Sequence, residues 1–285
     1  MYPHKYLIET SRAVAVSVGA ACFWVRISIE RSQCGRDEME TAVPGSEAEE
    51  YVRGRGPFLA FLSEWYGSLR AARLPEVIEE AGGPGNVVIV CADVTNCFTR
   101  YGPLYSPRVA TIVPPIVDLL KLAYSLGIRD FVLPEDNHPI DSPEFEAWGP
   151  HCAAGTKEAE TVADIKDLPF SDLFLVFPKQ NLNPGIDTAF PGWLEEHPNM
   201  RRFIVVGDCT DLCIYQTVTF LRLRANQFKL EYDVIVPANC VNTFDIPVET
   251  ARANNMLPYD ADLIHPLFLY HMVLNGIRVV RELVP

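Results

Sequence analysis

The sequence predicts an α/β protein with three layers, in which a mostly parallel central sheet of about six strands lies between two layers of helices. Short apolar runs rich in Val, Ile, Leu and Phe recur along the chain, and stretches of helical length separate them. Strands that alternate with helices are typical of a parallel sheet with helices on both faces. Polar residues follow the ends of several of these strands, which predicts a site at one edge of the sheet.

Six apolar runs are short enough to be buried strands. The run Val87–Cys91 is continuous and rich in β-branched residues, which suits a central strand covered on both faces. Asp93 follows its end. The predicted strands span residues 87–91, 130–133, 173–177, 203–206, 234–236 and 277–280.

The predicted helices fall before and between these strands. Phe58, Phe61 and Trp65 recur near helical spacing in the first helix, and Gly127 closes the second. After the fourth strand, Gly207 ends the apolar run, and Thr210 or Asp211 can cap the helix that follows. The predicted helices span residues 57–72, 109–126, 186–196, 211–226, 247–254 and 262–275.

Composition and charge disfavour a nucleic-acid-binding protein, a zinc ribbon and a thioredoxin-type protein. The chain has 285 residues, 48% of them hydrophobic, and a formal net charge of -13. This charge disfavours a nucleic-acid partner, because a phosphate backbone attracts a basic face. The chain has eight cysteines and no Cys-x-x-Cys pair, which disfavours a zinc ribbon or a thioredoxin-type redox motif. We interpret the cysteines as reduced thiols and expect a cytoplasmic protein.

Residues 1–52 differ from the rest of the chain. The apolar run Ala13–Val25 could be the core of a signal peptide, but no clear cleavage site follows it, and it is too short to span a bilayer. We favour an upstream extension that packs loosely or stays disordered, and we expect no membrane partner. The acidic stretch 37–50 is typical of a linker. The folded domain would then span residues 53–285.

Four strands end next to residues that carry chemistry. Asp93 follows the first strand, Asp136 and His138 the second, Lys179 the third and Cys213 the fourth. In open α/β sheets the ligand crevice lies at this edge. A carboxylate can accept a thiol proton, an ammonium can stabilise the resulting charge, and a helix N-terminus can favour a thiolate. The alternative is that Cys213 is a small buried core residue, as most free cysteines are.

A second group of residues has the composition of a metal site. It consists of Asp136, His138, Glu144 and His151. Carboxylate and imidazole ligands together suit zinc, iron or manganese, with water filling open positions. Asp136 and His138 are two apart on a strand end and therefore share a face. The alternative for each histidine is an ordinary core or loop position.

Several blocks of the sequence resemble a known family. The blocks Asp93–Asn96 with Phe98, Lys179, and Gly207–Cys213 resemble the catalytic blocks of the isochorismatase-like cysteine hydrolases. Within that superfamily, nicotinamidases have metal-binding blocks similar to Asp136–His138 and Trp148–Cys152. Segments 239–247 and 265–276 are similar to the C-terminal part of plant-type nicotinamidases. The resemblance covers about two thirds of the chain, and the sequence departs from the family pattern at Asp208 and Cys209, where small or apolar residues are more usual.

The resemblance implies a role for each matching residue. Cys213 would be the nucleophile, Asp93 the general base and Lys179 the third member of the triad. The peptide bond Asp208–Cys209 would be cis, so that the backbone N–H groups of Cys209 and Cys213 form an oxyanion hole. Asp136, His138 and His151 would bind a divalent metal ion (Zn, Fe or Mn), and Glu144 stands where some members have a fourth ligand. Phe98, Trp148 and Leu212 would bind the substrate.

The activity that this resemblance implies is deamidation of nicotinamide to nicotinate and ammonia through a cysteine thioester, a step of NAD salvage. A related small amide of the carbamoyl or maleamate type is an alternative substrate, and a non-catalytic member that binds a small molecule is another alternative. Isochorismate hydrolysis fits less well, because that branch usually lacks the nucleophilic cysteine. Related enzymes often assemble, so we expect a homo-oligomer. The apolar segment Pro266–Tyr270 could then be core or interface.

Overall fold

The computed structural model describes residues 45–285. The apolar run 13–25 and residues 37–44 of the predicted linker lie outside the described residues. Residues 45–50 of that predicted linker are helical, because α1 begins at Gly45 and runs to Gly67. Glu47, Ala48 and Glu49 are good helix formers, which explains why the helix starts earlier than the apolar pattern predicted.

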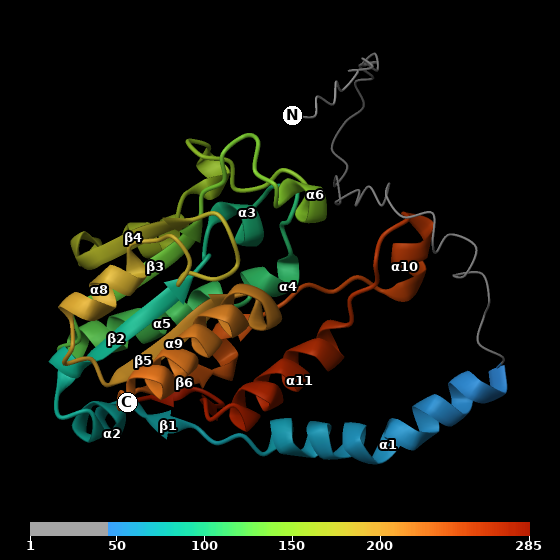
Figure 1. Cartoon of the computed structure of the whole chain (residues 1–285), viewed down its shortest axis with the longest axis horizontal. Helices are drawn as coiled ribbons and strands as arrows, with labels where there is room; N and C mark the ends of the chain where they lie inside the picture. Colours follow the sequence, from blue (N-terminus) through green and yellow to red (C-terminus); the bar gives the residue numbers. More distant parts are fainter. Residues whose placement is uncertain (1–44) are drawn as a thin grey trace, which may run out of the picture.

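The six predicted strands form one continuous parallel sheet (Figure 1). Its strand order is β4-β3-β2-β5-β6-β8. A short strand, β7, pairs with the end of β5 and makes the sheet seven-stranded. A separate two-stranded sheet joins β1 (Ala72–Arg73) to β9 (Leu283–Val284). The strands of the main sheet are β2 (Val87–Ala92), β3 (Asp130–Asp136), β4 (Phe174–Lys179), β5 (Arg202–Asp208), β6 (Asp233–Pro237), β7 (Val241–Asn242) and β8 (Arg278–Val280).

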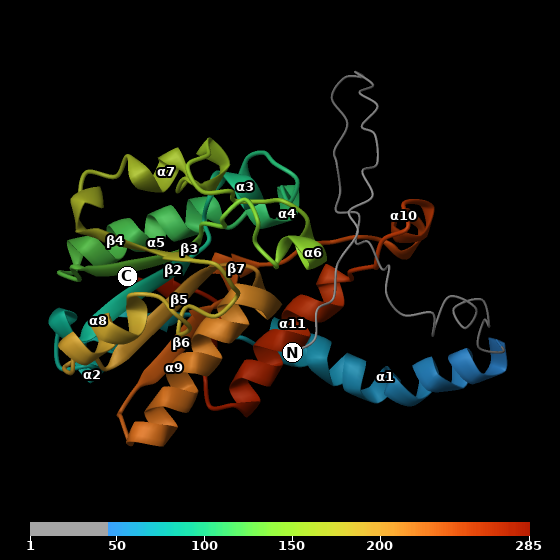
Figure 2. The same cartoon turned by 45° about the horizontal axis from the view of Figure 1, so that its top comes forward.

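Helices cover both faces of the sheet, which confirms the three-layer architecture. Residues of β2 alternate between the two cores, so that Ile89 clusters with side chains of α5 (Val113–Ser125) and Val90 with those of α9 (Tyr215–Phe228). Figure 2 shows α5 on one side of the sheet and α9 on the other. The second core also holds side chains of α8 (Phe190–Glu196) and α11 (Ala261–Leu274).

The remaining helices are short and lie mostly in the connections around the carboxyl edge of the sheet. They are α2 (Leu74–Glu80), α3 (Asn96–Thr99), α4 (Pro107–Ala110), α6 (Phe145–Trp148), α7 (Ala163–Lys166) and α10 (Val248–Ala253). Single helical turns are η1 (Pro84–Asn86), η2 (Lys157–Ala159), η3 (Ser171–Leu173), η4 (Thr210–Ile214) and η5 (Ala238–Cys240). In the described part of the chain, none of the helices combines the length and apolar character needed to span a bilayer.

Prolines explain two helices that differ from the sequence prediction. The stretch predicted as one helix over 109–126 is divided into α4 and α5, and α5 begins with Val113-Pro114-Pro115. The helix predicted over 186–196 begins only at Phe190, with Pro191 in its first turn. Proline lacks an N–H and has a fixed φ, so it favours the first turn of a helix over its interior.

Helix α1 packs on α11 through its C-terminal half. Leu62 is buried, and the ring centroids of Trp65 and Tyr270 lie 5.2 Å apart. Leu269 of α11 is buried in the core, so the segment Pro266–Tyr270 belongs at least partly to the packing of this chain. Figure 1 shows the N-terminal half of α1 extending away from the body of the domain.

Gly207 lets two central strands meet at the edge where the predicted site residues lie. It pairs with Ala92 in the register of β2 and β5 and has a φ of 120°. A Cβ atom at this position would lie 1.9 Å from the carbonyl oxygen of Ala92. Only glycine combines this backbone conformation with so close an approach.

We predict that Gly207→Ala lowers the free energy of unfolding by about 2 kcal/mol or more, because the added methyl group forces β2 and β5 apart. Urea denaturation followed by circular dichroism measures the change. Gly192→Ala is the matched control, because Gly192 lies in α8 and an added Cβ atom there meets nothing within 4 Å. Equal stability of the two variants would contradict this account of Gly207.

Candidate active site

Asp93 directly follows the central strand β2 and lies at the carboxyl edge of the sheet. It is fully buried and adopts a φ of 58°, which is uncommon for a residue other than glycine. Its backbone N–H donates to the carbonyl of Pro134, 3.0 Å away. One carboxylate oxygen accepts a hydrogen bond of 2.8 Å from the backbone N–H of Asp136. These bonds fix the Asp93 carboxylate between β2 and β3.

Lys179 brings the separate strand ends together. It is the last residue of β4, lies in register with Asp136 at the end of β3, and is 1% exposed. Its Nζ atom lies 2.8 Å from Oδ2 of Asp93 and also contacts Oδ1 of Asp136. Burial alone would lower the pKa of Lys179, but the Asp136 and Asp93 carboxylates outweigh it and hold the pKa well above its usual value.

Cys213 lies on the other side of this ammonium group. Its Sγ atom is 3.5 Å from Lys179 Nζ and within 4.8 Å of carboxylate oxygens of Asp93 and Asp136. The sequence predicted Cys213 in the first turn of a regular helix. The structure places it instead in η4, and α9 begins at Tyr215 after non-helical dihedrals at Leu212. The thiol therefore precedes the helix N-terminus and still faces the carboxyl edge.

The pKa values of these groups indicate their resting protonation states. Burial raises the pKa of the Cys213 thiol well above its usual value, although the nearby Lys179 ammonium opposes this. Burial and the neighbouring Asp136 raise the pKa of Asp93 to about 6, again against the effect of Lys179. Near neutral pH the resting state is thus a thiol beside a carboxylate, which is the arrangement that general-base catalysis requires.

Asp136, His138 and His151 form a second buried cluster that shares Asp136 with the first. Oδ2 of Asp136 lies 3.6 Å from Nε2 of His138 and 3.8 Å from Nε2 of His151. The three ligand atoms all lie within 4.8 Å of one another. Burial alone would raise the pKa of Asp136, but Lys179 and the two imidazoles outweigh it and hold the pKa below its usual value.

The chemistry of this donor set fits a divalent metal ion. Nε2 of His138 is buried and has no hydrogen-bond partner among the described residues. Nδ1 of His151 lies 2.8 Å from the carbonyl of Gly149, and Nδ1 of His138 lies 3.4 Å from Oγ of Ser142. With its Nδ1 hydrogen-bonded in this way, each imidazole can turn the Nε2 lone pair toward a metal. Glu144 lines the same cavity but is not part of this three-residue cluster, so its role as a ligand stays a prediction.

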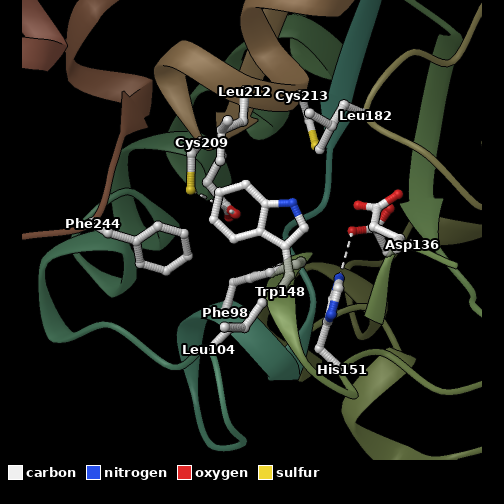
Figure 3. Close-up of a pocket in the computed structure, with 12 residues that line it drawn as sticks. Phe98, Leu104, Asp136, Trp148, His151, Leu182, Cys209, Leu212, Cys213 and Phe244 are labelled. Atoms are coloured by element: carbon white, nitrogen blue, oxygen red, sulfur yellow. Dashed lines mark hydrogen bonds and ion pairs between the residues drawn. The ribbon is translucent and has the colours of Figure 1, made fainter. Parts of the chain in front are cut away.

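The two clusters open on one cavity. Its volume is about 20 Å³, enough for roughly one water molecule. In Figure 3 the Trp148 indole lies in the middle of the labelled side chains, so we expect it to turn aside when a substrate enters. The predicted substrate-binding residues Phe98, Trp148 and Leu212 all line the cavity, together with Leu104, Asp136, Glu144, His151, Leu182, Asp208, Cys209, Cys213 and Phe244.

Asp208 is a polar residue of the cavity wall for which the sequence analysis predicted no role. It ends β5, is 1% exposed and lines the cavity, and its peptide bond to Cys209 is cis, as the resemblance predicted. Burial, together with the Asp93 and Asp136 carboxylates, raises the pKa of Asp208 well above its usual value. Its position at the end of a predicted strand was the available signal. Leu182 and Phe244 gave no such signal, because long connections bring them to the cavity.

A chain of hydrogen-bonded side chains connects the cysteine-bearing turn to helix α1. Nδ1 of His265 in α11 lies 2.8 Å from Oγ1 of Thr210 in η4, and its Nε2 lies 3.2 Å from the hydroxyl of Tyr66 in α1. Burial and the nearby Arg108 lower the pKa of His265 to about 4. The His265 imidazole is therefore neutral when it contacts the Thr210 hydroxyl.

Fold and site together define an α/β cysteine hydrolase, with the nucleophile candidate at the carboxyl edge of a parallel sheet. A family model described as the isochorismatase domain matches residues 87–265. The chain belongs to this isochorismatase family and is a hydrolase.

Individual relatives agree with this assignment. Nicotinamidase 1 of Arabidopsis thaliana is 29% identical over 216 residues, which cover 70% of this chain and 86% of that protein. The structure is similar to that of nicotinamidase from Bacillus subtilis, with a TM-score of 0.54, 20% identity, and coverage of 68% of this chain and 99% of that one. N-carbamoylsarcosine amidase from Thermoplasma acidophilum gives a TM-score of 0.52 and 20% identity, covering 69% of this chain and 96% of that one. At these identities the structural matches show the fold.

We predict that His265 makes stability fall at acid pH. Because the folded pKa is about 4 and the ordinary value is 6.5, the unfolded chain binds more protons between these pH values. The free energy of unfolding should therefore drop by about 2 kcal/mol from this residue between pH 7 and pH 4.5. Urea denaturation of the wild type and His265→Gln at both pH values checks this, and the difference between the two proteins should shrink as pH falls. Parallel pH profiles would show that His265 does not have this effect.

Proposed function

We propose that this hydrolase is a metal-dependent cysteine amidohydrolase that converts nicotinamide to nicotinate and ammonia. The observation that carries the proposal is the sharing of Asp136 between the two clusters, since its carboxylate contacts both Lys179 and the histidine pair. A nucleophile and a metal-ligand set thus face one small cavity with aromatic walls. A flat ring that bears both an amide and a basic nitrogen matches this arrangement. The similarity to nicotinamidase 1 of Arabidopsis thaliana supports the same substrate.

In the first half of the reaction, Asp93 takes the proton of the Cys213 thiol while the sulfur attacks the amide carbon. The carbonyl oxygen becomes an oxyanion, which the backbone N–H groups of Cys209 and Cys213 would stabilise. The intermediate collapses when the C–N bond breaks. Asp93 returns its proton to the leaving nitrogen, so ammonia departs and a thioester remains. Lys179 stabilises negative charge on sulfur and carboxylate throughout.

In the second half, water attacks the thioester carbon and gives a proton to Asp93. The C–S bond breaks, the proton on Asp93 returns to the sulfur of Cys213, and the acid product loses the second proton of the water to solvent and leaves as nicotinate. Phe98 and Trp148 would hold the ring between them. Asp136, His138 and His151 would hold a zinc, iron or manganese ion, which when bound supplies a Lewis acid that orients the ring nitrogen. Assembly into a homo-oligomer stays a prediction.

A second candidate keeps this chemistry and changes the substrate to another small amide, of the carbamoyl or maleamate type. The observation that favours a substrate other than unsubstituted nicotinamide is the Asp208 carboxyl group in the cavity wall. A polar group at that point has no evident partner on unsubstituted nicotinamide, so the two candidates differ in what they require of Asp208.

We predict that Cys213→Ala lowers the rate of ammonia release from nicotinamide by a factor on the order of 10⁴ or more, because no other group can form the thioester. A glutamate dehydrogenase assay coupled to ammonia measures the rate. Cys240→Ala is the control, because that thiol is also buried but does not line the cavity. Activity retained in Cys213→Ala would refute the mechanism.

We predict that His138→Ala loses bound metal, because it removes one of the three proposed ligands. The ligand atom would be the buried Nε2 atom, which has no hydrogen-bond partner among the described residues. Elemental analysis after reconstitution should find about one metal ion per chain in the wild type and far less in the variant. Cys213→Ala should keep its metal, because it leaves all three ligands in place. A wild type without metal, or a variant with unchanged content, would remove the metal from the proposal.

A further inference from the structure

Asp208 is a buried polar group that the proposed reaction does not use. It lies in the cavity wall beside Cys209 and Cys213, and it is 1% exposed. Apolar side chains make up the nearby wall, including Leu104, Leu212 and Phe244. A carboxyl group among such neighbours loses its hydration and needs a partner within the cavity.

The charges around Asp208 keep its carboxyl group neutral. The carboxylates of Asp93 and Asp136 already lie in the same interior, and Lys179 is engaged with both of them. Asp208 forms no ion pair with any described residue, so an ionised carboxylate at this position would be a desolvated charge beside apolar side chains, which is costlier than a neutral acid. Burial and these two carboxylates raise the pKa of Asp208 accordingly.

The two oxygens of this neutral acid have different surroundings. The Cys209 thiol donates to Oδ1 across 3.9 Å, so Oδ1 acts as the acceptor. The acid proton therefore belongs on Oδ2. Oδ2 is buried and has no hydrogen-bond partner among the described residues. The cavity wall thus contains an O–H donor that lacks an acceptor.

We infer that Asp208 is a specificity-determining residue, which donates a hydrogen bond from Oδ2 to an acceptor on the substrate other than the scissile amide. This inference rests on the proposed function and extends its substrate class from nicotinamide to ring carboxamides that carry a second, neutral acceptor. A ring nitrogen or ring carbonyl has this chemistry. An anionic acceptor, such as the carboxylate of maleamate, would lose its hydration beside the apolar side chains of this wall.

Four neutral amides test the inference. Nicotinamide is the reference, and pyrazine-2-, pyrimidine-5- and pyridazine-4-carboxamide each keep its ring nitrogen and add one more, ortho, meta or para to the amide. The measurement is kcat/KM for ammonia release, expressed relative to nicotinamide so that a general loss of activity cancels. Maleamate completes the set as the anionic amide.

Variants at Asp208 separate the hydrogen bond from the shape of the side chain. Asp208→Leu has the same branching without a donor, and Asp208→Asn keeps an N–H donor. We expect the wild type to prefer at least one added ring nitrogen, and Asp208→Leu to reduce that preference about tenfold or more. Asp208→Asn should retain most of it. Maleamate should be hydrolysed at least about tenfold less efficiently than the preferred ring amide by the wild type.

Glu135→Gln provides the matched control. Glu135 is also a buried carboxyl group, with a pKa raised by burial to about 8, but it accepts a hydrogen bond from Thr161 and does not line the cavity. Its substitution should leave the relative preferences unchanged. Urea denaturation midpoints and metal content of all variants show whether each has folded.

The outcomes distinguish this inference from the proposed function. If the ring amides are hydrolysed but Asp208→Leu keeps the wild-type preferences, the function stands and the role of Asp208 is wrong. Loss of the preference in Asp208→Asn as well as Asp208→Leu would show that donation is not the contact. Maleamate as the best substrate would overturn the neutral-acceptor class. Ammonia release from none of the ring amides would overturn the proposed function, and the inference with it.

Discussion

The contact of one buried ammonium group with two carboxylates and a thiol is the interaction on which the site depends. Burial alone would destabilise the charged forms of Lys179, Asp93 and Asp136, but the ammonium group and the two carboxylates attract each other. Removing one partner from such a buried group typically costs about 3–5 kcal/mol, because it leaves a charge without a counter-ion. The same contact joins the ends of β2, β3 and β4 and places the Cys213 thiol beside the Asp93 carboxylate, as the proposed proton transfer requires.

The parallel sheet makes this contact possible. Every strand of the main sheet ends at the same edge, and β2 lies where the strand order reverses, with β3 on one side and β5 on the other. Residues that are far apart in sequence therefore meet there without a long excursion of the chain. Gly207 allows β5 to approach β2 closely at this point. Rigid strand ends hold the polar groups, while the aromatic walls come from connections that can adapt to a substrate.

The sequence was sufficient to predict the sheet and the convergence of its polar residues, because both follow from local patterns. Six apolar runs became six strands, and the residues directly after them, such as Asp93 and Lys179, came together. Helix ends were less predictable where prolines at 114 and 191 restart a helix. Leu182 and Phe244 line the cavity through long connections, and Tyr66 reaches the site through His265. Such positions depend on tertiary packing that no local spacing encodes.

The charge balance of the interior connects the two clusters and the cavity wall. Lys179 carries one positive charge and contacts two carboxylates, those of Asp93 and Asp136. The three groups together therefore keep a net charge of about -1, and Asp136 lies beside the imidazoles of His138 and His151. That remaining charge suits a divalent cation, which neutral histidines can bind without adding further charge. Asp208 at the end of β5 forms no ion pair with any described residue, and its burial raises its pKa, so it is held as a neutral acid. In the proposed reaction, the buried charges beside the thiol and the neutral acid in the cavity wall therefore belong to one electrostatic environment.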